Sequence, residues 1–406
     1  MMNRDNRNGP YSITTWCKCA LLIVTVLLSG RPALGRRIPK MNVFALEFSP
    51  DGRQLAAALG VTDYDVDDLY HEVRIWNVSD WSVAASWREP DAYCLGYSPD
   101  GRFLAVGTMM GRGVVIRDLT THYEVSRLVL LQRDDWVSEV RFSQNGKYLA
   151  VDVNEFVVVW DIGQLANPQE IGRTPVVNTR PAKFAFADDG KSLVYSTEAG
   201  AVQVVDLPAF TLRRQTKLSP IEEGTVFETF DRAGRQLLTT TDRYVQTWNV
   251  EANRALPTVS KNGSAIGSVF SHNGRRFAFV TARRDDSPEQ FVRVFDVNSP
   301  KELQRFPYSS STLIRTIALS PDGSMVAAGG AGAEDSEDTR YPIKVWDVDS
   351  GEIAAELYYD QSSDDETSAA SLTWVFVVVA IALLALLLAL ATWLRRRAAQ
   401  RRQTPQ

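Results

Sequence analysis

The 406-residue chain has few of the side chains from which disulfide frameworks and metal centres are built. It contains three cysteines, and two of them, Cys17 and Cys19, lie near the N-terminus, so disulfides cannot hold the fold together. Its three histidines disfavour a histidine-based metal centre. It has no Gly-x-Ser-x-Gly elbow, and residues 43–359 hold no amphipathic helical stretch of ordinary length. The sequence therefore predicts a non-enzymatic protein without a metal or cofactor.

The middle of the chain also lacks an excess of positive charge. Residues 36–371 carry 35 Lys and Arg side chains against 48 Asp and Glu. A nucleic-acid-binding protein needs a positive face that neutralises phosphates, so this balance argues against a nucleic-acid partner. The remaining basic residues flank two hydrophobic segments, which indicates a membrane topology.

The first hydrophobic segment, Ala20–Leu28, is short. As a helix it would extend about 14 Å, whereas the hydrocarbon core of a bilayer is about 30 Å thick. Basic residues precede it and Ala33-Leu34-Gly35 follow it, as in a secretory signal with cleavage after Gly35. We interpret residues 1–35 as a signal peptide, with an uncleaved N-terminal anchor as the alternative.

The second hydrophobic segment, Leu372–Leu394, has no charged residue and a tryptophan near each end. As a helix it would extend about 34 Å, which is enough to cross a bilayer. The linker 360–371 before it is acidic, and the tail 395–406 after it is rich in arginine. The positive-inside rule therefore predicts a single-pass membrane protein with a cytoplasmic tail and with residues 43–359 outside the cytoplasm. Leu372–Leu394 would contact membrane lipid.

The segment between the two hydrophobic runs is a tandem repeat. A turn-marking glycine recurs seven times at intervals of 40 to 49 residues, a period typical of repeat folds. The clearest turns read Ser-Pro-Asp-Gly, in which proline presets φ and glycine accepts a positive φ. The seven glycines are Gly52, Gly101, Gly146, Gly190, Gly234, Gly274 and Gly323.

A short motif follows each glycine after 14 to 24 residues, and in its clearest form it reads Trp-Asp or Trp-Asn after an apolar or β-branched residue. The motif stands at the end of an alternating run that is rich in β-branched residues. Such runs predict strands with one buried face. Each repeat offers four strands, which in the third repeat are Ser138–Phe142, Tyr148–Val153, Phe156–Trp160 and Gln169–Gly172. In four repeats the third strand ends in a tryptophan, and we expect these to occupy equivalent buried positions: Trp76, Trp160, Trp248 and Trp346.

Seven units with Ser-Pro-Asp-Gly turns and Trp-Asp endings resemble the WD40 repeat family over roughly 315 of the 406 residues. The resemblance implies an all-β fold over residues 43–359, a closed seven-bladed β-propeller of four-stranded antiparallel blades. No Gly-His dipeptide occurs, so the family's Asp-His-Ser-Trp hydrogen-bond set cannot form, and we expect packing to hold the ring. Each blade is complete in sequence order, so no strand is expected to be exchanged between the first and last blades.

Three short motifs have structural interpretations. Gly190-Lys191-Ser192 is similar to the end of a phosphate-binding loop, but the required first glycine is absent, so we interpret it as a blade turn. Gly329–Gly332 is expected to be a flexible connector. Cys94 lies in an alternating run and is expected to be a small buried hydrophobe.

The three histidines, His71, His122 and His272, fall in different predicted loops. The strand order places His122 and His272 on one face of the ring and His71 on the other. They cannot share a metal ion, and we interpret them as unrelated surface histidines.

The connectors between the second and third strands of each repeat differ in length. They are short in the third to fifth repeats and long in the first, sixth and seventh: Gly60–Glu72, Arg283–Gln290 and Gly329–Tyr341. The resemblance implies that these connectors emerge on one face of three adjacent blades and form one acidic lobe. Because loops carry function and acidic surfaces attract basic molecules, we expect the lobe to bind a protein partner that is basic. Weak calcium binding by the first connector is the alternative. The acidic residues of the lobe are Asp63, Asp65, Asp67, Asp68, Glu72, Asp285, Asp286, Glu289, Glu334, Asp335, Glu337 and Asp338.

The sequence thus favours a membrane-anchored protein-interaction module or scaffold. One alternative is a propeller-type enzyme, a lactonase or hydrolase, which would need convergent carboxylates, histidines or a metal in the central channel. Another is a cytoplasmic-facing propeller on a C-terminal anchor, an arrangement that resembles exchange factors for small GTPases at the endoplasmic reticulum. The predicted N-terminal signal argues against the latter.

Overall fold

The computed structural model describes most of the repeat region. The chain divides into two units, Met1–Pro39 and Lys40–Gln406, and all described residues belong to the second. No helix in the described ranges is long and apolar enough to cross a membrane. The described residues are 41–61, 71–129, 136–154, 156–174, 183–187, 189–197, 200–222, 224–261, 263–282, 290–308, 312–332, 343–358 and 391.

Four of the segments predicted from the sequence lie outside these ranges. They are the signal peptide 1–35, the linker 360–371, the membrane segment Leu372–Leu394 apart from Ala391, and the basic tail 395–406.

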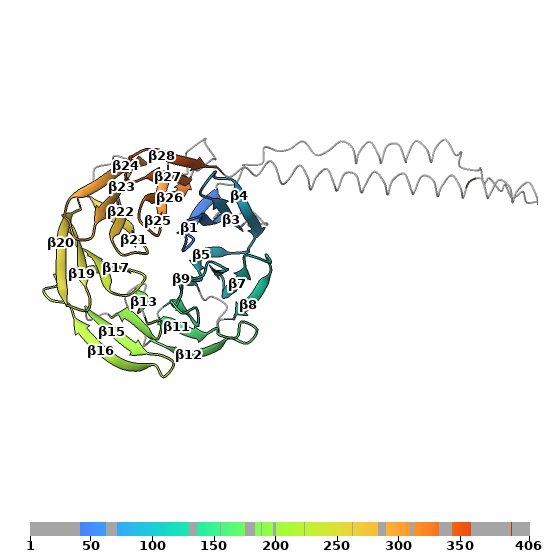
Figure 1. Ribbon diagram of the computed structural model, residues 1–406, viewed down its shortest axis with the longest axis horizontal. Coiled ribbons are helices and arrows are strands. Elements are labelled where there is room, and N and C mark those ends of the chain that lie inside the picture. The colour runs from blue at the N-terminus through green and yellow to red at the C-terminus, as the bar shows by residue number, and fades with distance from the viewer. Residues whose placement is uncertain are drawn as a thin grey trace, which may run out of the picture. The chain divides into compact units, whose positions relative to one another are not determined.

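Within the described ranges, the chain forms seven four-stranded antiparallel sheets, each built from four consecutive strands (Figure 1). The strands of blades 1 to 3 are β1 (Met41–Phe48), β2 (Gln54–Val61), β3 (His71–Asn77), β4 (Val83–Arg88), β5 (Ala92–Tyr97), β6 (Phe103–Thr108), β7 (Val114–Asp118), β8 (Glu124–Leu128), β9 (Val137–Phe142), β10 (Tyr148–Val153), β11 (Phe156–Asp161) and β12 (Gln169–Arg173). Those of blades 4 and 5 are β13 (Phe184–Phe186), β14 (Ser192–Ser196), β15 (Ala201–Asp206), β16 (Thr211–Lys217), β17 (Val226–Phe230), β18 (Gln236–Thr240), β19 (Tyr244–Asn249) and β20 (Arg254–Ser260). Those of blades 6 and 7 are β21 (Ser264–Phe270), β22 (Arg276–Ala282), β23 (Gln290–Asp296), β24 (Glu302–Tyr308), β25 (Thr312–Leu319), β26 (Met325–Gly332), β27 (Ile343–Asp347) and β28 (Ile353–Leu357).

The first strand of each blade lines the centre of the ring. These innermost strands contact one another in the order β1, β5, β9, β13, β17, β21 and β25, and β25 contacts β1 (Figure 1). The first and last blades are both complete in sequence order, as expected. The ring therefore closes by contact between neighbouring sheets and not by exchange of a strand.

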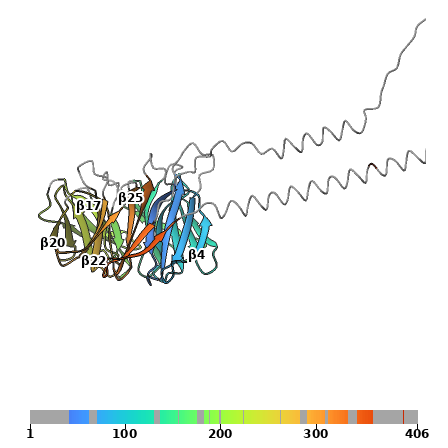
Figure 2. The same cartoon turned by 90° about the horizontal axis from the view of Figure 1, so that it is seen from above.

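The strand order gives the ring two distinct faces, and Figure 2 shows the strands running between them. Because each blade is an antiparallel meander, its first-to-second and third-to-fourth turns lie on one face, here called the turn face. The second-to-third connectors and the links between blades lie on the opposite face, here called the connector face.

The Ser-Pro-Asp-Gly turns form as the sequence predicts. All seven turn glycines have a positive φ, between 59° and 78°. In the first turn Ser49 Oγ donates to Asp51 Oδ1 at 2.6 Å and accepts from the Gln54 amide at 2.9 Å. In the same turn the Gly52 amide donates to the Ser49 carbonyl, and the Gly190 amide donates to the Ala187 carbonyl in the equivalent way. The turn that contains Gly190 lies between β13 and β14, so the resemblance to a phosphate-binding loop has no structural counterpart.

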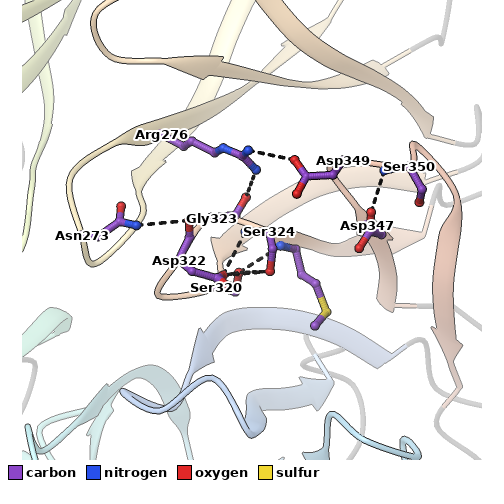
Figure 3. Close-up of polar contacts among 10 residues, drawn as sticks. Asn273, Arg276, Ser320, Asp322, Gly323, Ser324, Asp347, Asp349 and Ser350 are labelled. Carbon is purple, nitrogen blue, oxygen red and sulfur yellow. Dashed lines mark hydrogen bonds and ion pairs between the residues drawn. The ribbon is translucent and has the colours of Figure 1, made fainter.

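Adjacent turns are joined by hydrogen bonds, as Figure 3 shows for blades 6 and 7. Asn273 Nδ2 donates to the Asp322 carbonyl at 3.1 Å. Arg276 donates through Nη1 to the Gly323 carbonyl at 2.9 Å and through Nη2 to Asp349 Oδ1 at 2.8 Å (Figure 3). Hydrogen bonds between turns therefore join neighbouring blades in addition to the side-chain packing that we expected to hold the ring.

The four tryptophans occupy equivalent positions, as expected. Each pairs with the second residue of the second strand of its blade: Trp76 with Leu55, Trp160 with Leu149, Trp248 with Leu237 and Trp346 with Val326. Their environments differ, however. Trp76, Trp248 and Trp346 are buried, whereas Trp160 is half-buried and its Nε1 lacks a hydrogen-bond partner in the described structure.

The expectation that Gly329–Gly332 is a flexible connector is wrong. These residues end strand β26, where Gly330 pairs with Ile314 of β25. A Cβ at Gly330 would overlap the Leu313 carbonyl oxygen, and one at Gly329 would lie 2.8 Å from Val43 Cγ1. The glycines are therefore explained by close packing of strands.

Candidate functional site

The connectors on the connector face differ in length from blade to blade, as the sequence predicts. β10 ends at Val153 and β11 begins at Phe156, whereas β2 ends at Val61 and β3 begins at His71. The corresponding gaps in blades 6 and 7 run from β22 to β23 and from β26 to β27, and they are also long. Blades 6, 7 and 1 are adjacent, so the strand ends that border the three long gaps belong to neighbouring blades.

Of the acidic residues proposed for partner binding, Glu72 alone lies among the described residues. It belongs to β3, is 2% exposed, and accepts a hydrogen bond from Arg74 Nε at 2.7 Å. Its carboxylate is therefore not presented to a partner, because the strand begins earlier than the sequence indicates. The other residues lie outside the described ranges: Asp63, Asp65, Asp67, Asp68, Asp285, Asp286, Glu289, Glu334, Asp335, Glu337 and Asp338.

The described part of the connector face exposes large apolar side chains. Trp136, which precedes β9, is 47% exposed, and Leu313, at the start of β25, is 61% exposed. Trp136 packs edge-on against Tyr93 at 5.0 Å between ring centroids, and Tyr93 lies 5.6 Å from Phe44. Phe44, Tyr93 and Trp136 thus form an aromatic row across blades 1, 2 and 3. The sequence analysis does not identify this row.

The histidines are not all on the surface. His122 is exposed on the turn face, as expected. His71 is 3% exposed, packs its ring against Phe44, and has its pKa lowered by burial. His272 lines a cavity in the channel. His71 and His272 lie on opposite faces, as the strand order indicates. The interpretation of His71 as a surface residue is wrong, and His272 is half-buried.

A cavity of about 180 Å³ lies at the turn-face end of the central channel. It is lined by the last residues of the innermost strands and by the turns that follow them. Its lining includes apolar residues such as Leu46, Val140 and Val269, and Phe48, Phe186, Phe230 and Phe270, which are almost fully buried in the hydrophobic clusters of the blades. Its charged and titratable members are Glu47, Glu139, Arg141, Arg232 and His272.

Two arginines connect blades that are not neighbours across this cavity. Arg141, on β9, donates from Nη1 to the Phe230 carbonyl at 3.3 Å, while its Nε contacts Glu139 Oε1 at 2.5 Å. Arg232, which follows β17, donates from Nη2 to the Tyr97 carbonyl at 3.5 Å. The channel therefore contains two guanidinium groups at its turn-face end.

The partner of Arg232 on the neighbouring turn is His272, whose Nδ1 lies 3.1 Å from Arg232 Nη1. Burial and the two arginine charges lower the pKa of His272 to about 3, so its ring is neutral at physiological pH and a ring nitrogen accepts from Arg232. Burial also lowers the pKa of Arg232. The remaining N–H groups of Arg232 have no partner in the described part of the chain.

Glu47 faces the same cavity without a salt bridge. Its Oε1 accepts from the Tyr97 amide at 3.3 Å, and none of the ion pairs among the described residues includes it. Burial raises the pKa of Glu47 to about 7, although the charges of Arg232 and Arg141 oppose the rise. The cavity therefore combines two cations with a carboxyl group that is partly protonated at neutral pH.

Two other features of the described residues bear on chemistry, the cysteine Cys94 and the potential metal ligands. Cys94 is buried, its Sγ lies 3.6 Å from the Val137 carbonyl, and burial raises its pKa well above the ordinary value, which confirms the predicted role as a small hydrophobe. Within the described ranges, no group of three His, Cys, Asp or Glu side chains could hold a metal ion.

The sequence alone did not lead us to the cavity, although the positions of its charged residues within the repeats would have indicated it. Glu47 and Arg141 occupy equivalent positions, next to the last residue of an innermost strand. Arg232 and His272 stand where the clearest turns have proline. Charged residues in these two columns of the repeat are the features that would have pointed to the channel.

Comparison with known proteins agrees with this architecture. No family model matches the chain. It is 24% identical over 237 residues to the human U3 small nucleolar RNA-associated protein 18 homolog, a match that covers 56% of this chain and 40% of the relative. The match thus spans about two fifths of the length of that relative. Among solved structures, the β-propeller domain of Cps50 (Swd1) from Myceliophteria thermophila aligns with a TM-score of 0.55 and 17% identity, covering 75% of this chain and 98% of that domain. The described residues therefore have the fold of a seven-bladed β-propeller.

Proposed function

We propose that the chain is a membrane-anchored, non-enzymatic interaction module whose propeller binds a protein partner outside the cytoplasm. The observation that carries this proposal is the composition of the connector face. It combines exposed apolar side chains near the channel with long acidic connectors on three adjacent blades. Clusters of exposed apolar groups with a charged rim are typical of protein-binding surfaces.

The apolar part of this face provides an anchor for a partner. Trp136 is half exposed but is held in place by its edge-on contact with Tyr93. Rigid, partly exposed tryptophans are enriched among the residues that dominate binding energy at interfaces. Met110 and Val226 are also more than half exposed on the same face, at 58% and 53%.

The acidic connectors favour a basic partner. Their charge would raise the association rate at low ionic strength, and salt would weaken the effect. The name of the human relative associates that protein with RNA. The acidic balance of residues 36–371 does not favour RNA as the ligand of this chain.

The membrane attachment rests on the sequence of Leu372–Leu394 and of the tail behind it. The twelve residues of the linker 360–371 reach at most about 40 Å, so the propeller would stay close to the bilayer. Protease added to intact cells should digest the propeller and spare the tail. Digestion only after permeabilisation would place the propeller in the cytoplasm.

The partner surface is tested by pull-down from membranes with Trp136→Ala and with the matched control Tyr123→Ala. Tyr123 is 74% exposed and lies on the turn face. We expect Trp136→Ala to reduce partner recovery at least tenfold, and Tyr123→Ala to leave it unchanged. Equal recovery by both variants would place the binding surface elsewhere.

The contribution of the acidic connectors is tested separately by replacing Asp63, Asp65, Asp67 and Asp68 with lysine. This variant should slow partner capture at low salt and match the parent at high salt. Recovery that is the same for both proteins at every salt concentration would remove the acidic connectors from the proposal.

A further inference from the structure

The cavity at the turn-face end of the channel is separate from the connector face. It lies at the opposite end of the innermost strands from Trp136 and from the long connectors. Two arginines face it from blades 3 and 5, so it concentrates positive charge at one end of the channel.

We propose that the cavity binds a small carboxylate with an apolar body, with Arg232 as the group that receives the carboxylate. Arg232 lines the cavity and has N–H groups without a partner among the described residues. A guanidinium can bind a carboxylate through two parallel hydrogen bonds. Arg141 adds a second positive charge, although Glu139 pairs with it.

The wall and the volume define the rest of the ligand. Apolar residues make up most of the rest of the lining, among them Leu46, Val140 and Val269, and Phe48, Phe186, Phe230 and Phe270 pack behind it in the hydrophobic clusters of the blades. The cavity measures about 180 Å³. An apolar cavity of about 150 Å³ is large enough for benzene, so a six-membered ring with a carboxylate is of suitable size.

Glu47 makes binding depend on pH. A carboxylate ligand would place a second negative charge near Glu47 and would favour its protonated form, which can donate a hydrogen bond. The other charged groups around Glu47 are Arg141, Arg232 and Glu139, and His272 is neutral in this range. Because the pKa of Glu47 is about 7, affinity should fall as the pH rises from 6 to 8, and binding should take up a proton.

The same carboxylate chemistry could come from a free small acid or from the C-terminus of a partner peptide. The test therefore uses benzoate, a tetrapeptide Gly-Gly-Gly-Phe with a free carboxylate, and the corresponding amides as neutral controls. The full chain is placed in lipid nanodiscs, and empty nanodiscs correct for partition of benzoate into lipid. Binding is measured by calorimetry at pH 6, 7 and 8.

Benzoate should bind and benzamide should not. Arg232→Met should weaken binding at least tenfold, whereas Arg275→Met, an exposed cation on the same face, should leave it unchanged. Binding of the peptide acid in place of benzoate would assign the site to a terminal carboxylate. Equal affinity for the acids and the amides, or no binding of either acid, would overturn the proposal.

Glu47→Gln provides a second test that does not remove an arginine. This variant should bind benzoate with an affinity that is constant between pH 6 and 8, and more tightly than the parent at pH 8. A pH dependence as steep as that of the parent would show that Glu47 does not face the ligand. This assay contains no partner protein, so its outcome is independent of the proposed function of the connector face.

Discussion

Asp152 should make the stability of the propeller depend on pH. Its side chain lies in β10, is fully buried, and accepts from Ser138 Oγ at 2.5 Å through Oδ2. Its Oδ1 has no hydrogen-bond partner among the described residues. Burial raises the pKa of Asp152 to about 7, and the charge of Glu139 adds to the effect.

The direction of the effect follows from proton binding. In the unfolded chain an aspartate loses its proton near pH 3.9, whereas in the folded protein Asp152 keeps its proton up to about pH 7. Between these values the folded state binds more protons, so the free energy of unfolding falls as the pH rises. A shift of about three pKa units corresponds to at most about 4 kcal/mol, all of it lost by about pH 8.

Asp152→Asn should remove this dependence, because the amide stays neutral and can still accept from Ser138. Denaturant midpoints of the full chain at pH 4, 6 and 8 measure it. The variant and the parent should have similar midpoints at pH 4, and the variant should be the more stable at pH 8 by about 2–4 kcal/mol. Glu251→Gln, in an exposed turn, is the control and should follow the parent. Parallel pH profiles for Asp152→Asn and the parent would refute the argument.

The remaining predictions concern packing and membrane attachment. Trp248→Ala should destabilise the fold by about 3–5 kcal/mol, and Trp160→Ala by clearly less, because Trp248 is buried and donates to Thr239 Oγ1 at 3.0 Å; similar denaturation midpoints would contradict this. Gly330→Ala should cost about 1–3 kcal/mol through its clash with β25, measured in the same way. Deleting residues 372–406 should move the protein from the membrane pellet to the supernatant after fractionation, and continued pelleting would count against the anchor.

The repeat architecture could be predicted because its signals are local. A Ser-Pro-Asp-Gly turn is specified by four successive residues, and its hydrogen bonds join Ser49 to Asp51 and Gln54 within one turn. The number of blades, the order of their strands and the equivalence of the tryptophans all follow from counting such turns. The unequal lengths of the connectors follow in the same way.

Burial could not be predicted at positions where distant strands decide it. His71 and Glu72 look like loop residues because acidic sequence precedes them, but β3 has already begun and both are enclosed by neighbouring strands. Gly330 looks flexible, yet its backbone lies against β25. In each case the environment is set by a partner strand and not by the adjacent sequence.

The residues that line the channel can be predicted only by comparing equivalent positions in the seven repeats. The residue before the last one of each innermost strand is Glu47, Gly96, Arg141, Ala185, Thr229, Val269 or Ala318, and six of these seven line the cavity. Arg232 reaches Tyr97, which is 135 residues away in the sequence, because the ring brings blades 5 and 2 face to face across the channel. Small residues at all seven of these positions would leave the channel empty, and large apolar residues would fill it. Here Glu47 and Arg141 stand among small and apolar residues at these positions, and Arg232 adds a second guanidinium from the turn after β17. The ring therefore encloses charge and free volume together, which is the combination that a site for a small charged ligand requires.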